Sequence, residues 1–294
     1  MDLIDYIVWT YVFIDDWFKK TIDRKRLRQR GFEPSLADSE VLTMEIIGEY
    51  LGLATDTAIY RYFQRHWHQF FPALPHRSNF VRQAGNLLQV KQQFFEYLSQ
   101  PFEHDLQIID SMPIEVCRFV RARRSKQFKG DARYGHWHGQ TFFGFRLHLK
   151  IDQRGMIHTG IIAPANEHDS SYVDSLLGQD THGWLLADKG YRGNERKERL
   201  WQDRRIYFYT PLQRHEISQC QLTEPTKRQL NGIRRLVETV AGQLSEQFNI
   251  KTTTARDTWH LTNRVVRKVL SHTLAIYTNI QQGKKPLAIV PLVR

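Results

Sequence analysis

Three carboxylates interrupt segments that the sequence otherwise predicts to be apolar. Asp110 lies in the run QIIDSMPIEV and shares side-chain parity with Ile108, so the pattern places it on an otherwise apolar face of a strand. A buried charge of this kind is unfavourable unless it is paired or binds a metal ion. Asp188 ends the strand-like run WLLAD, and open α/β sheets bind their ligands at the C-terminal ends of strands. Glu238 lies beside the apolar stripe of a predicted helix, with Arg234 one turn before it.

These residue types suit metal-assisted chemistry at phosphorus. Two aspartates on neighbouring strands and a glutamate on a helix that packs against them can hold two divalent ions about 4 Å apart, an arrangement used for in-line attack at phosphodiesters. Ligands that are all oxygen favour Mg²⁺ or Mn²⁺, whereas zinc prefers histidine or cysteine. A single carboxylate would be interpreted as a solvated surface charge, since most are. The arrangement of the three is what predicts the site.

The composition indicates a globular protein with an anionic partner. The 294 residues are enough for one large domain or two smaller ones, and 41% of them are apolar, which is sufficient for a core. Lys and Arg number 42 against 31 acidic residues, which gives a formal charge of +11 and a sequence pI near 9.7. Nucleic acid is the first candidate partner for such a charge, with an anionic membrane or an acidic protein as alternatives.

The sequence also predicts the compartment. No run approaches the roughly 20 apolar residues of a membrane span. The N-terminal run carries aspartates where a signal peptide has positive charge. It instead predicts a packed helix, because apolar residues recur at helical spacing: Ile4, Ile7, Val8, Tyr11 and Phe18. Cys117 and Cys220 show no disulfide or zinc spacing, so we expect a protein of the reducing cytoplasm that spans no membrane.

Residues 1–103 are predicted to be helical. A cap at Asp38 or Ser39 begins the helix SEVLTMEIIGEYL, and TAIYRYFQRHWHQF repeats apolar residues at the spacing of a second helix. The turn GLATD between them offers Thr55 or Asp56 as the next cap. Two helices about such a turn are typical of a helix-turn-helix, although a helical hairpin in a small bundle gives the same pattern. The residues of the second helix expected to face DNA are Tyr60, Arg61 and Arg65.

Residues 104–280 are predicted to form a mixed five-stranded α/β domain. Three strand-like runs come first, LQIIDSMPIEVCRFV, TFFGFRLHLKI and MIHTGIIAP, and the last two form a hairpin about DQRG. A short helix in DSSYVDSLL, the strand WLLAD, the helix NERKERLWQDR and the strand RIYFYTP follow, and a long helix from about Thr226 to Phe248 carries Glu238. Asp169 or Ser170 is expected to cap the short helix, and His168 and Asp169 are expected to have such a capping role rather than to catalyse. Residues 281–294 are expected to be a loose tail.

A basic segment, RARRSKQFKGDARYGHWHG, lies between the first two predicted strands. Such a run is either a solvated surface or a loop that grips DNA phosphates, and the carboxylates elsewhere in the domain favour DNA. Lys189 and Arg192 flank Asp188 and are expected either to neutralise a phosphate or to balance the negative charge of the site. The other predicted DNA contacts of this domain are Arg121, Arg123, Arg124, Lys126, Lys129, Arg133, Arg234 and Arg235.

Three motifs, IIDSMPIEV, LLADKGYRG and RRLVETVAGQLSEQF, resemble in this order the signatures of bacterial insertion-sequence transposases of the DDE type, whose catalytic domain has a ribonuclease H-like fold. PANEHDS also resembles the family, and the similarity runs from about residue 104 to 280. The resemblance implies that Asp110, Asp188 and Glu238 are the catalytic triad and the metal ligands. Arg234 matches an arginine that some relatives have near the glutamate, whereas Ser245 stands where they have a lysine.

The resemblance also implies an activity and partners. Such an enzyme binds the terminal inverted repeats of its insertion sequence through a helical region like residues 1–103. It hydrolyses a phosphodiester to free a 3′-hydroxyl and joins that hydroxyl to target DNA, with two Mg²⁺ or Mn²⁺ ions per site. The expected partners are double-stranded DNA, at the ends and at the target, and further copies of the chain in a homodimer or higher homo-oligomer. The expected location is the bacterial cytoplasm, in association with the nucleoid.

Two other functions stay open from the sequence. A nuclease of the same fold would use the same three carboxylates, because hydrolysis and strand transfer are both attacks on phosphorus by an activated oxygen. A DNA-binding protein descended from a transposase would have lost the chemistry. Loss of any carboxylate would support the second alternative, and all three are present.

Overall fold

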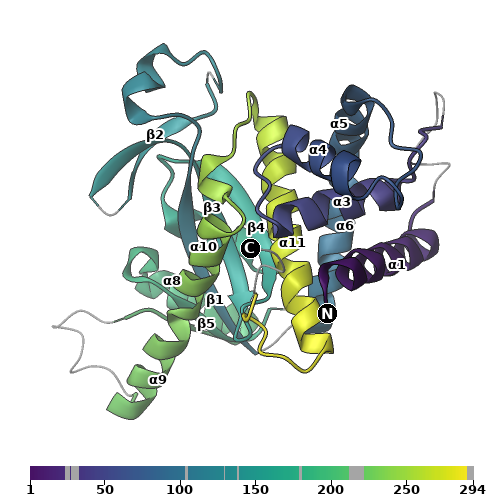
Figure 1. Ribbon diagram of the computed structural model, residues 1–294. Coiled ribbons are helices and arrows are strands. Elements are labelled where there is room, and N and C mark those ends of the chain that lie inside the picture. The colour runs from purple at the N-terminus through teal and green to yellow at the C-terminus, as the bar shows by residue number, and fades with distance from the viewer. Residues whose placement is uncertain are drawn as a thin grey trace. The chain divides into compact units, whose positions relative to one another are not determined.

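The computed structural model describes residues 1–23, 27, 33–102, 105–128, 130–137, 139–178, 181–211 and 222–289. The chain divides into two compact units (Figure 1). The first, here called the helical unit, contains Met1–Leu98, Leu244–Thr278 and the described residues from Ala288 onward. The second, the sheet unit, contains Ser99–Gln243 and Asn279–Leu287. Among the described residues, no helix has the length and apolar character that a membrane span requires.

The helical unit is a bundle whose helices begin where polar side chains cap them. Asp2 accepts a hydrogen bond from the N–H of Asp5 at 2.8 Å, and the Thr55 hydroxyl accepts one from the N–H of Ala58 at 3.1 Å. The bundle buries one apolar core that draws on its helices from both ends of the sequence. Its helices are α1 (Leu3–Thr21), α3 (Asp38–Tyr50), α4 (Asp56–His66), α5 (Arg77–Asn86), α6 (Leu88–Ser99) and most of α11 (Thr258–Gln281).

Details of these helices differ from the sequence predictions. Ile4 and Val8, predicted in the packed stripe of α1, are 48% and 43% exposed, because the buried side of the helix is instead centred on Ile7 and Ile14. The predicted cap of α3 at Asp38 or Ser39 is also wrong. The helix begins at Asp38, so Ala37 is at the cap position, and the N–H of Ala37 donates to the Glu40 carboxylate. The second predicted helix ends at His66 rather than at residue 70.

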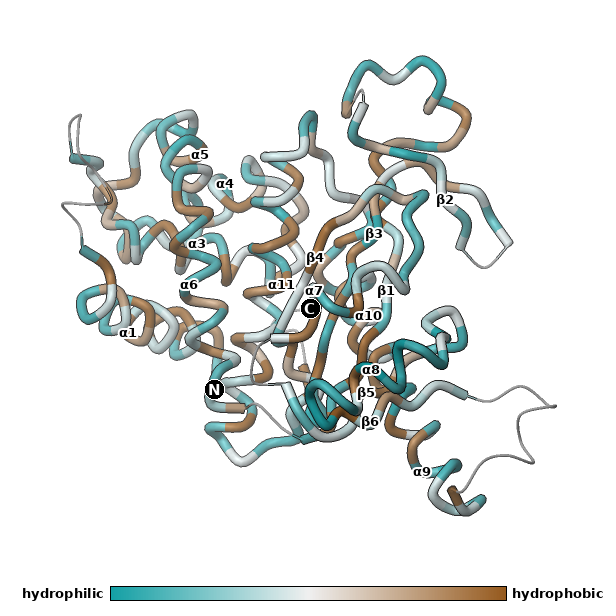
Figure 2. The backbone as a smooth tube through the Cα atoms, turned by 180° about the vertical axis from the view of Figure 1, so that it is seen from behind, coloured by the Kyte–Doolittle hydropathy of each residue, from teal (hydrophilic) through white to brown (hydrophobic). Residues whose placement is uncertain are grey.

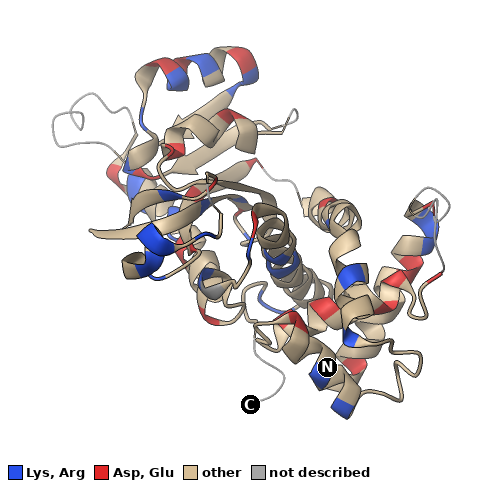
Figure 3. Cartoon of the chain, turned by 90° about the horizontal axis from the view of Figure 1, so that it is seen from above, with Lys and Arg blue, Asp and Glu red and all other residues tan. Residues whose placement is uncertain are grey.

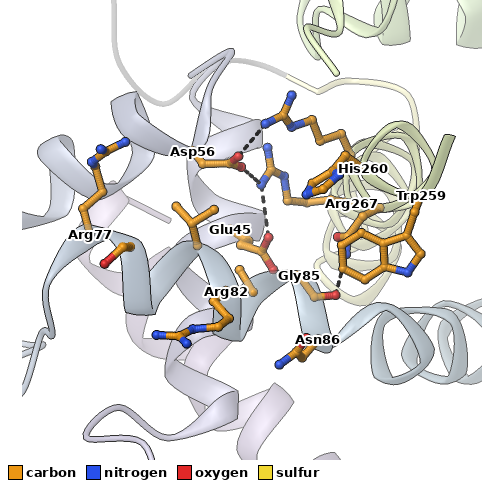
Figure 4. Close-up of a pocket in the computed structure, with 14 residues that line it drawn as sticks. Glu45, Asp56, Arg77, Arg82, Gly85, Asn86, Trp259, His260 and Arg267 are labelled. Carbon is orange, nitrogen blue, oxygen red and sulfur yellow. Dashed lines mark hydrogen bonds and ion pairs between the residues drawn. The ribbon is translucent and has the colours of Figure 1, made fainter. Parts of the chain in front are cut away.

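Buried ion pairs join the helices of this unit (Figure 4). Arg267 of α11 lies 2.6 Å from Glu49, 3.1 Å from Glu45 and 2.6 Å from Asp56. Lys268 pairs with Glu49 at 2.6 Å, and Lys91 of α6 pairs with Glu45 at 2.7 Å. Because every one of these buried charges has a partner, α3 can carry two glutamates and still be buried along nearly its whole length.

The sheet unit contains a mixed sheet of six strands within the described residues. The hydrogen-bonded order is β2-β3-β1-β5-β6, and β4 pairs with β3. The pairs that involve β3 are antiparallel, whereas β5 lies parallel to both β1 and β6. The strands are β1 (Leu106–Glu115), β2 (Arg133–Trp137), β3 (Gln140–Asp152), β4 (Ile157–Pro164), β5 (Gly183–Ala187) and β6 (Ile206–Tyr209).

Helices α7 (Val173–Leu176) and α8 (Asn194–Arg204) cover one face of this sheet, where they bury a core with Ile109, Leu185 and Ala187. Figure 2 shows β5 coloured largely hydrophobic and α8 largely hydrophilic, and α8 packs through its buried residue Leu200. Helices α9 (Glu224–Arg234) and α10 (Leu236–Glu246) follow, and α9 contacts β5.

The sheet differs from its prediction in three places. The first strand ends at Glu115 instead of continuing to residue 120, and Phe119–Arg124 forms a 3₁₀ helix, η2. Part of the basic segment forms β2, where Gly135 allows an approach to the main chain of Ala165 that a Cβ atom would block at 2.5 Å. The predicted helix 226–248 is two helices, because the chain turns at Arg235. With β2 added, the sheet within the described residues has six strands rather than the predicted five.

The division into units also differs from the predicted boundaries. The prediction assigned residues 104–280 to one domain, but α11 contributes Leu270 and Leu274 to the core of the helical unit. The reason is that the charged side chains of α11 pair with α3 and its apolar side chains pack beside them. Of the predicted tail 281–294, residues up to Leu287 belong to the sheet unit, and residues 290–294 lie outside the described residues.

Gly183→Ala should destabilise the sheet unit by about 1–3 kcal/mol. Gly183 begins β5 with φ +79°, and a Cβ atom there would lie 2.2 Å from the carbonyl oxygen of Asp105. The control is Gly232→Ala in α9, where a Cβ atom meets nothing within 4 Å and alanine favours the helix. Chemical denaturation of both variants measures the effect. Equal stability of Gly183→Ala and the wild type would contradict the strain assigned to this turn.

Candidate active site

Strand pairing places the first two carboxylates side by side. In the parallel pair of β1 and β5, Ile109 lies opposite Ala187. The next residue of each strand is an aspartate, Asp110 within β1 and Asp188 directly after β5. Both therefore lie at the same end of the same pair of strands, and the short 3₁₀ helix η4 (Lys189–Tyr191) carries the chain away from it.

Arg234 links the second carboxylate to the third. It is the last residue of α9, and its two terminal nitrogens lie 3.7 Å from Asp188 Oδ1 and 3.5 Å from Glu238 Oε1. The side chains of Asp188 and Glu238 are 51% and 58% exposed, whereas that of Arg234 is 16% exposed. The turn between α9 and α10 puts Glu238 in the first turn of α10, one helical step from Arg234. One guanidinium thus faces two carboxylates.

Asp110 lies in a less solvated position than the other two. The pKa of Asp110 is raised to about 7, chiefly by burial and also by the negative charges of Asp188 and Asp169. The N–H of Ser111, which donates to Asp110 Oδ1 at 2.8 Å, and the charge of Arg234 act in the opposite direction. A partly buried carboxylate near two other carboxylates is the kind of group that a bound cation would stabilise in its charged form.

Asp110→Asn should stabilise the metal-free protein, and more so at high pH. The pKa of about 7 exceeds the usual value near 3.9, so the native state retains a proton that the unfolded state releases between these values. Wild-type stability therefore falls as pH rises through this window. We expect the neutral amide to add about 1–3 kcal/mol at pH 8 and clearly less at pH 4.5. Denaturation curves with a chelator present measure both differences, and an equal gain at both pH values would contradict the assignment.

The three carboxylates suit a divalent cation by their chemistry. They offer only oxygen donors, which Mg²⁺ and Mn²⁺ prefer. Within the part of the chain that the structure describes, no three Asp, Glu, His or Cys side chains lie close enough together to hold one metal ion as they stand. Arg234 lies between two of the carboxylates, so a cation there would compete with its guanidinium for the same oxygens.

The basic residues next to the three carboxylates differ in their exposure to solvent. Lys189 and Arg235 are exposed, and Lys189 directly follows Asp188. Arg192 is partly buried, and its guanidinium donates to the carbonyl of Pro211 at 3.1 Å. Lys189 and Arg235 are therefore the members of this group whose charges reach solvent directly.

Figure 3 shows the Lys and Arg residues in blue, distributed over many elements of the chain. The basic segment is divided between η2, β2 and the residues that join them. Ala122 and Phe128 anchor it as buried residues, so the cationic side chains between them point outward. Lys129 lies outside the described residues. The predicted phosphate contacts that are exposed in the structure are Arg121, Arg123, Arg124, Lys126 and Arg133.

In the helical unit, Arg61 and Arg65 are exposed on α4. Tyr60, which was expected to face DNA with them, is only 8% exposed and its hydroxyl donates to the carbonyl of Pro75 at 3.0 Å. It belongs to the core because it falls one residue before Arg61 and so on another side of the helix. Its ring and its hydroxyl therefore contribute to the packing of the helical unit itself.

The sequence reasoning missed a pocket in the helical unit. Its volume is about 480 Å³, and it lies between α5 and the beginning of α11 (Figure 4). Arg77 and Arg82 of α5 line it together with Trp259, whose ring packs against Gly85, and the ion pairs of Arg267 form part of its lining. One sign of a pocket was present in the sequence, because RSNFVRQAGN carries Arg77 and Arg82 on one helical segment. Nothing in the sequence shows that α11 lies beside that segment.

The role predicted for Asp169 is also wrong. His168 occupies the cap position of the 3₁₀ helix η3 (Asp169–Tyr172) and makes no side-chain cap hydrogen bond. The Asp169 carboxylate instead accepts a hydrogen bond from the hydroxyl of Ser111, the residue after Asp110, at 2.8 Å. The only sequence signal for this contact was the resemblance carried by PANEHDS.

The family of the chain follows from its sequence match. Residues 101–258 match the family described as "Transposase DDE domain", a span that covers more than half of the chain and contains all three carboxylates. No solved structure matches the chain. The match, the mixed sheet and the preceding helices together confirm the predicted α/β fold of the ribonuclease H-like class. This chain belongs to the transposase DDE domain family.

Proposed function

We propose that the protein is a DNA transposase that binds the terminal inverted repeats of an insertion sequence, cleaves phosphodiesters to free 3′-hydroxyl ends and joins those ends to target DNA. The observation that carries the proposal is the pairing of β1 with β5, which places Asp110 beside Asp188, with Glu238 joined to Asp188 through Arg234. The family match is the second support, because this region lies within it.

In this proposal, Asp110, Asp188 and Glu238 hold two Mg²⁺ or Mn²⁺ ions. When bound, such ions activate the attacking oxygen and neutralise charge on the leaving oxygen. Arg234 balances the carboxylates, and it can turn to a DNA phosphate when they bind cations instead. Lys189, directly after Asp188, offers a second cation for a phosphate near the site. The chain needs no covalent intermediate, because the same site can serve attack by water and by a 3′-hydroxyl.

The exposed cations provide the DNA-binding surfaces of the proposal. In the sheet unit the exposed members are Arg121, Arg123, Arg124, Lys126, Arg133, Lys189 and Arg235, and the proposal includes the partly buried Arg192 and Arg234 as well. In the helical unit they are Arg61 and Arg65, to which the structure adds Arg77 and Arg82 at the rim of the pocket. We propose that the helical unit binds the inverted repeats and that the protein acts as a homodimer or higher homo-oligomer, because two ends must be joined to one target.

One experiment separates this function from its alternatives. Purified protein is incubated with Mg²⁺, a labelled DNA fragment that carries an end of the insertion sequence, and a supercoiled target plasmid. Label joined to the plasmid establishes transposition, and its loss with EDTA establishes the metal requirement. Nicked fragment without joined product would identify a nuclease of the same fold. A shifted but intact fragment at all Mg²⁺ and Mn²⁺ concentrations would identify a DNA-binding protein without the chemistry.

A further inference from the structure

A second polar cluster lies on the opposite face of β1 from Asp110. Ser111 and His148 are direct partners across β1 and β3, and Arg146 precedes His148 by two residues, so the three side chains share one face of the sheet. Asp169 covers them. Its Oδ1 accepts a hydrogen bond from Ser111 Oγ at 2.8 Å and lies 3.4 Å from an Arg146 nitrogen and 3.8 Å from His148 Nδ1.

Arg146 fixes this cluster in place. Its guanidinium donates to the carbonyl oxygens of Ala165 at 3.2 Å and of His136 at 2.6 Å, and to Ser111 Oγ at 3.3 Å. Its side chain is 12% exposed, so these bonds are largely shielded from water. The three bonds join β1, β2, β3 and the chain after β4. The partner that they hold for Asp169 is therefore rigid.

His148 closes the cluster on the side away from Arg146. It is fully buried, and its ring stacks on Tyr172 of η3 with the ring centroids 4.4 Å apart. The hydroxyl of Tyr172 donates to the Glu167 carboxylate. These contacts hold η3 against β3, and Asp169 is the first residue of η3. The carboxylate of Asp169 is thus located by both of its neighbours in the cluster.

Ser111 connects the cluster to the active site. Its hydroxyl donates to Asp169 on one face of β1, while its backbone N–H donates to Asp110 Oδ1 at 2.8 Å. A serine whose side chain is held by a fixed acceptor also holds its own N–H in one direction. Because this N–H holds the Asp110 carboxylate, the orientation of Asp110 depends on the hydrogen bond between Ser111 and Asp169.

We propose that Asp169 is a positioning residue of the active site, which orients Asp110 through Ser111 so that the Asp110 carboxylate is set to bind a divalent ion. This inference rests on the proposed function, because it takes Asp110 as a metal ligand. Hydrogen bonds that orient metal ligands typically change metal affinity by about 10- to 100-fold. Because Asp169 acts through one intervening residue, we expect the lower end of this range.

The test is the affinity of the full chain for Mn²⁺ without DNA, measured from the electron paramagnetic resonance signal of free Mn²⁺. Asp169→Ala and Ser111→Ala should each weaken binding about tenfold. The double variant should bind about as weakly as either single variant, because both changes break the same hydrogen bond. Asp169→Asn keeps an acceptor oxygen for Ser111 and should stay within about threefold of the wild type. A role in folding alone would not give this pattern of rescue and non-additivity.

Asp174→Asn is the matched control. This carboxylate lies five residues further along, is 54% exposed and pairs with Arg199 at 2.6 Å, so Mn²⁺ affinity should not change. Asp110→Ala separates the two proposals. Wild-type Mn²⁺ affinity in Asp110→Ala would overturn the metal site itself, whatever Asp169 does.

The positioning role has its own decisive outcomes. If Asp110→Ala abolishes Mn²⁺ binding while Ser111→Ala and Asp169→Ala bind like the wild type, the metal site stands and the positioning role is wrong. Losses that add in the double variant would also overturn it. Thermal melting of each variant establishes that it is folded. If Asp169→Ala does not fold, Ser111→Ala, which removes a single oxygen, still decides the question.

Discussion

Asp188→Ala should lower the rate of Mg²⁺-dependent DNA strand cleavage at least about a thousandfold, equivalent to about 4 kcal/mol of transition-state stabilisation. Asp188 lies beside Asp110 at the ends of paired strands and faces the guanidinium that also pairs with Glu238. The substitution therefore removes the carboxylate that lies beside Asp110 and also pairs with Arg234. Residues that act together in a site are strongly non-additive, so Asp188→Ala combined with Glu238→Ala should cleave hardly more slowly than Asp188→Ala alone.

The expected loss concerns chemistry and not folding or DNA binding. The Asp188 side chain is 51% exposed, and substitutions at such positions usually change stability by less than about 0.5 kcal/mol. Electrophoretic mobility shifts with an end fragment should therefore match the wild type, while cleavage of the same fragment is lost. Asp203→Ala, at an exposed position on α8, is the control and should cleave normally. Cleavage by Asp188→Ala at the wild-type rate would remove this residue from the site.

Arg267→Met should lower the free energy of unfolding of the helical unit by about 3–5 kcal/mol. The guanidinium of Arg267 pairs with Glu45, Glu49 and Asp56, and its side chain is 3% exposed. Methionine fills much of the space but leaves three carboxylates short of a partner in a poorly solvated region, where an unpaired charge is strongly unfavourable. The midpoint of thermal unfolding should fall by roughly 10 °C.

The same network predicts a pH dependence. Burial opposes ionisation of Asp56, but Arg267 and Arg264 outweigh it and hold the pKa of Asp56 well below its usual value. A carboxyl with a depressed pKa stabilises the native state above its unfolded pKa, and this stability is lost as pH falls below about 4. Arg267→Met should weaken that dependence, because one of the two guanidinium partners is gone.

Arg82→Met is the matched control for this prediction. Arg82 lines the same pocket but is exposed on α5, so the same substitution should change stability by less than about 0.5 kcal/mol. Chemical denaturation followed by circular dichroism of the helices measures both variants. Equal stability of Arg267→Met and Arg82→Met would mean that the buried network contributes nothing to the helical unit.

The candidate catalytic residues of the sheet unit stand out in the sequence because each breaks a local rule. Asp110 stands in an apolar strand, and Asp188 ends one, so alternation and strand ends are sufficient to single them out. The α/β class, confirmed by the structure and the family match, follows from the order of strand-like and helical periodicities, which are properties of short segments. The motif resemblance to DDE transposases was likewise readable from the chain alone and is confirmed by the family match.

Other features depended on contacts between segments far apart in the chain. Glu49 and Lys268 are separated by most of the sequence and each resembles an ordinary charged helix residue, yet they are buried against each other at 2.6 Å. Their pairing is why α11 belongs with the N-terminal helices rather than with the sheet that precedes it. Asp169 has a sequence context typical of a helix cap, and only the fold of η3 over β3 gives it Ser111 as a partner.

The sequence by itself singled out the candidate carboxylates for chemistry at phosphorus and the kinds of secondary structure on which they lie. Only the tertiary structure decided how they are held, because the register of β1 with β5 and the hydrogen bond from Ser111 to Asp169 join segments far apart in the chain. Local patterns encode propensity and burial, which act within a few residues. Register and pairing are set by the packing of the whole sheet, which no single segment specifies.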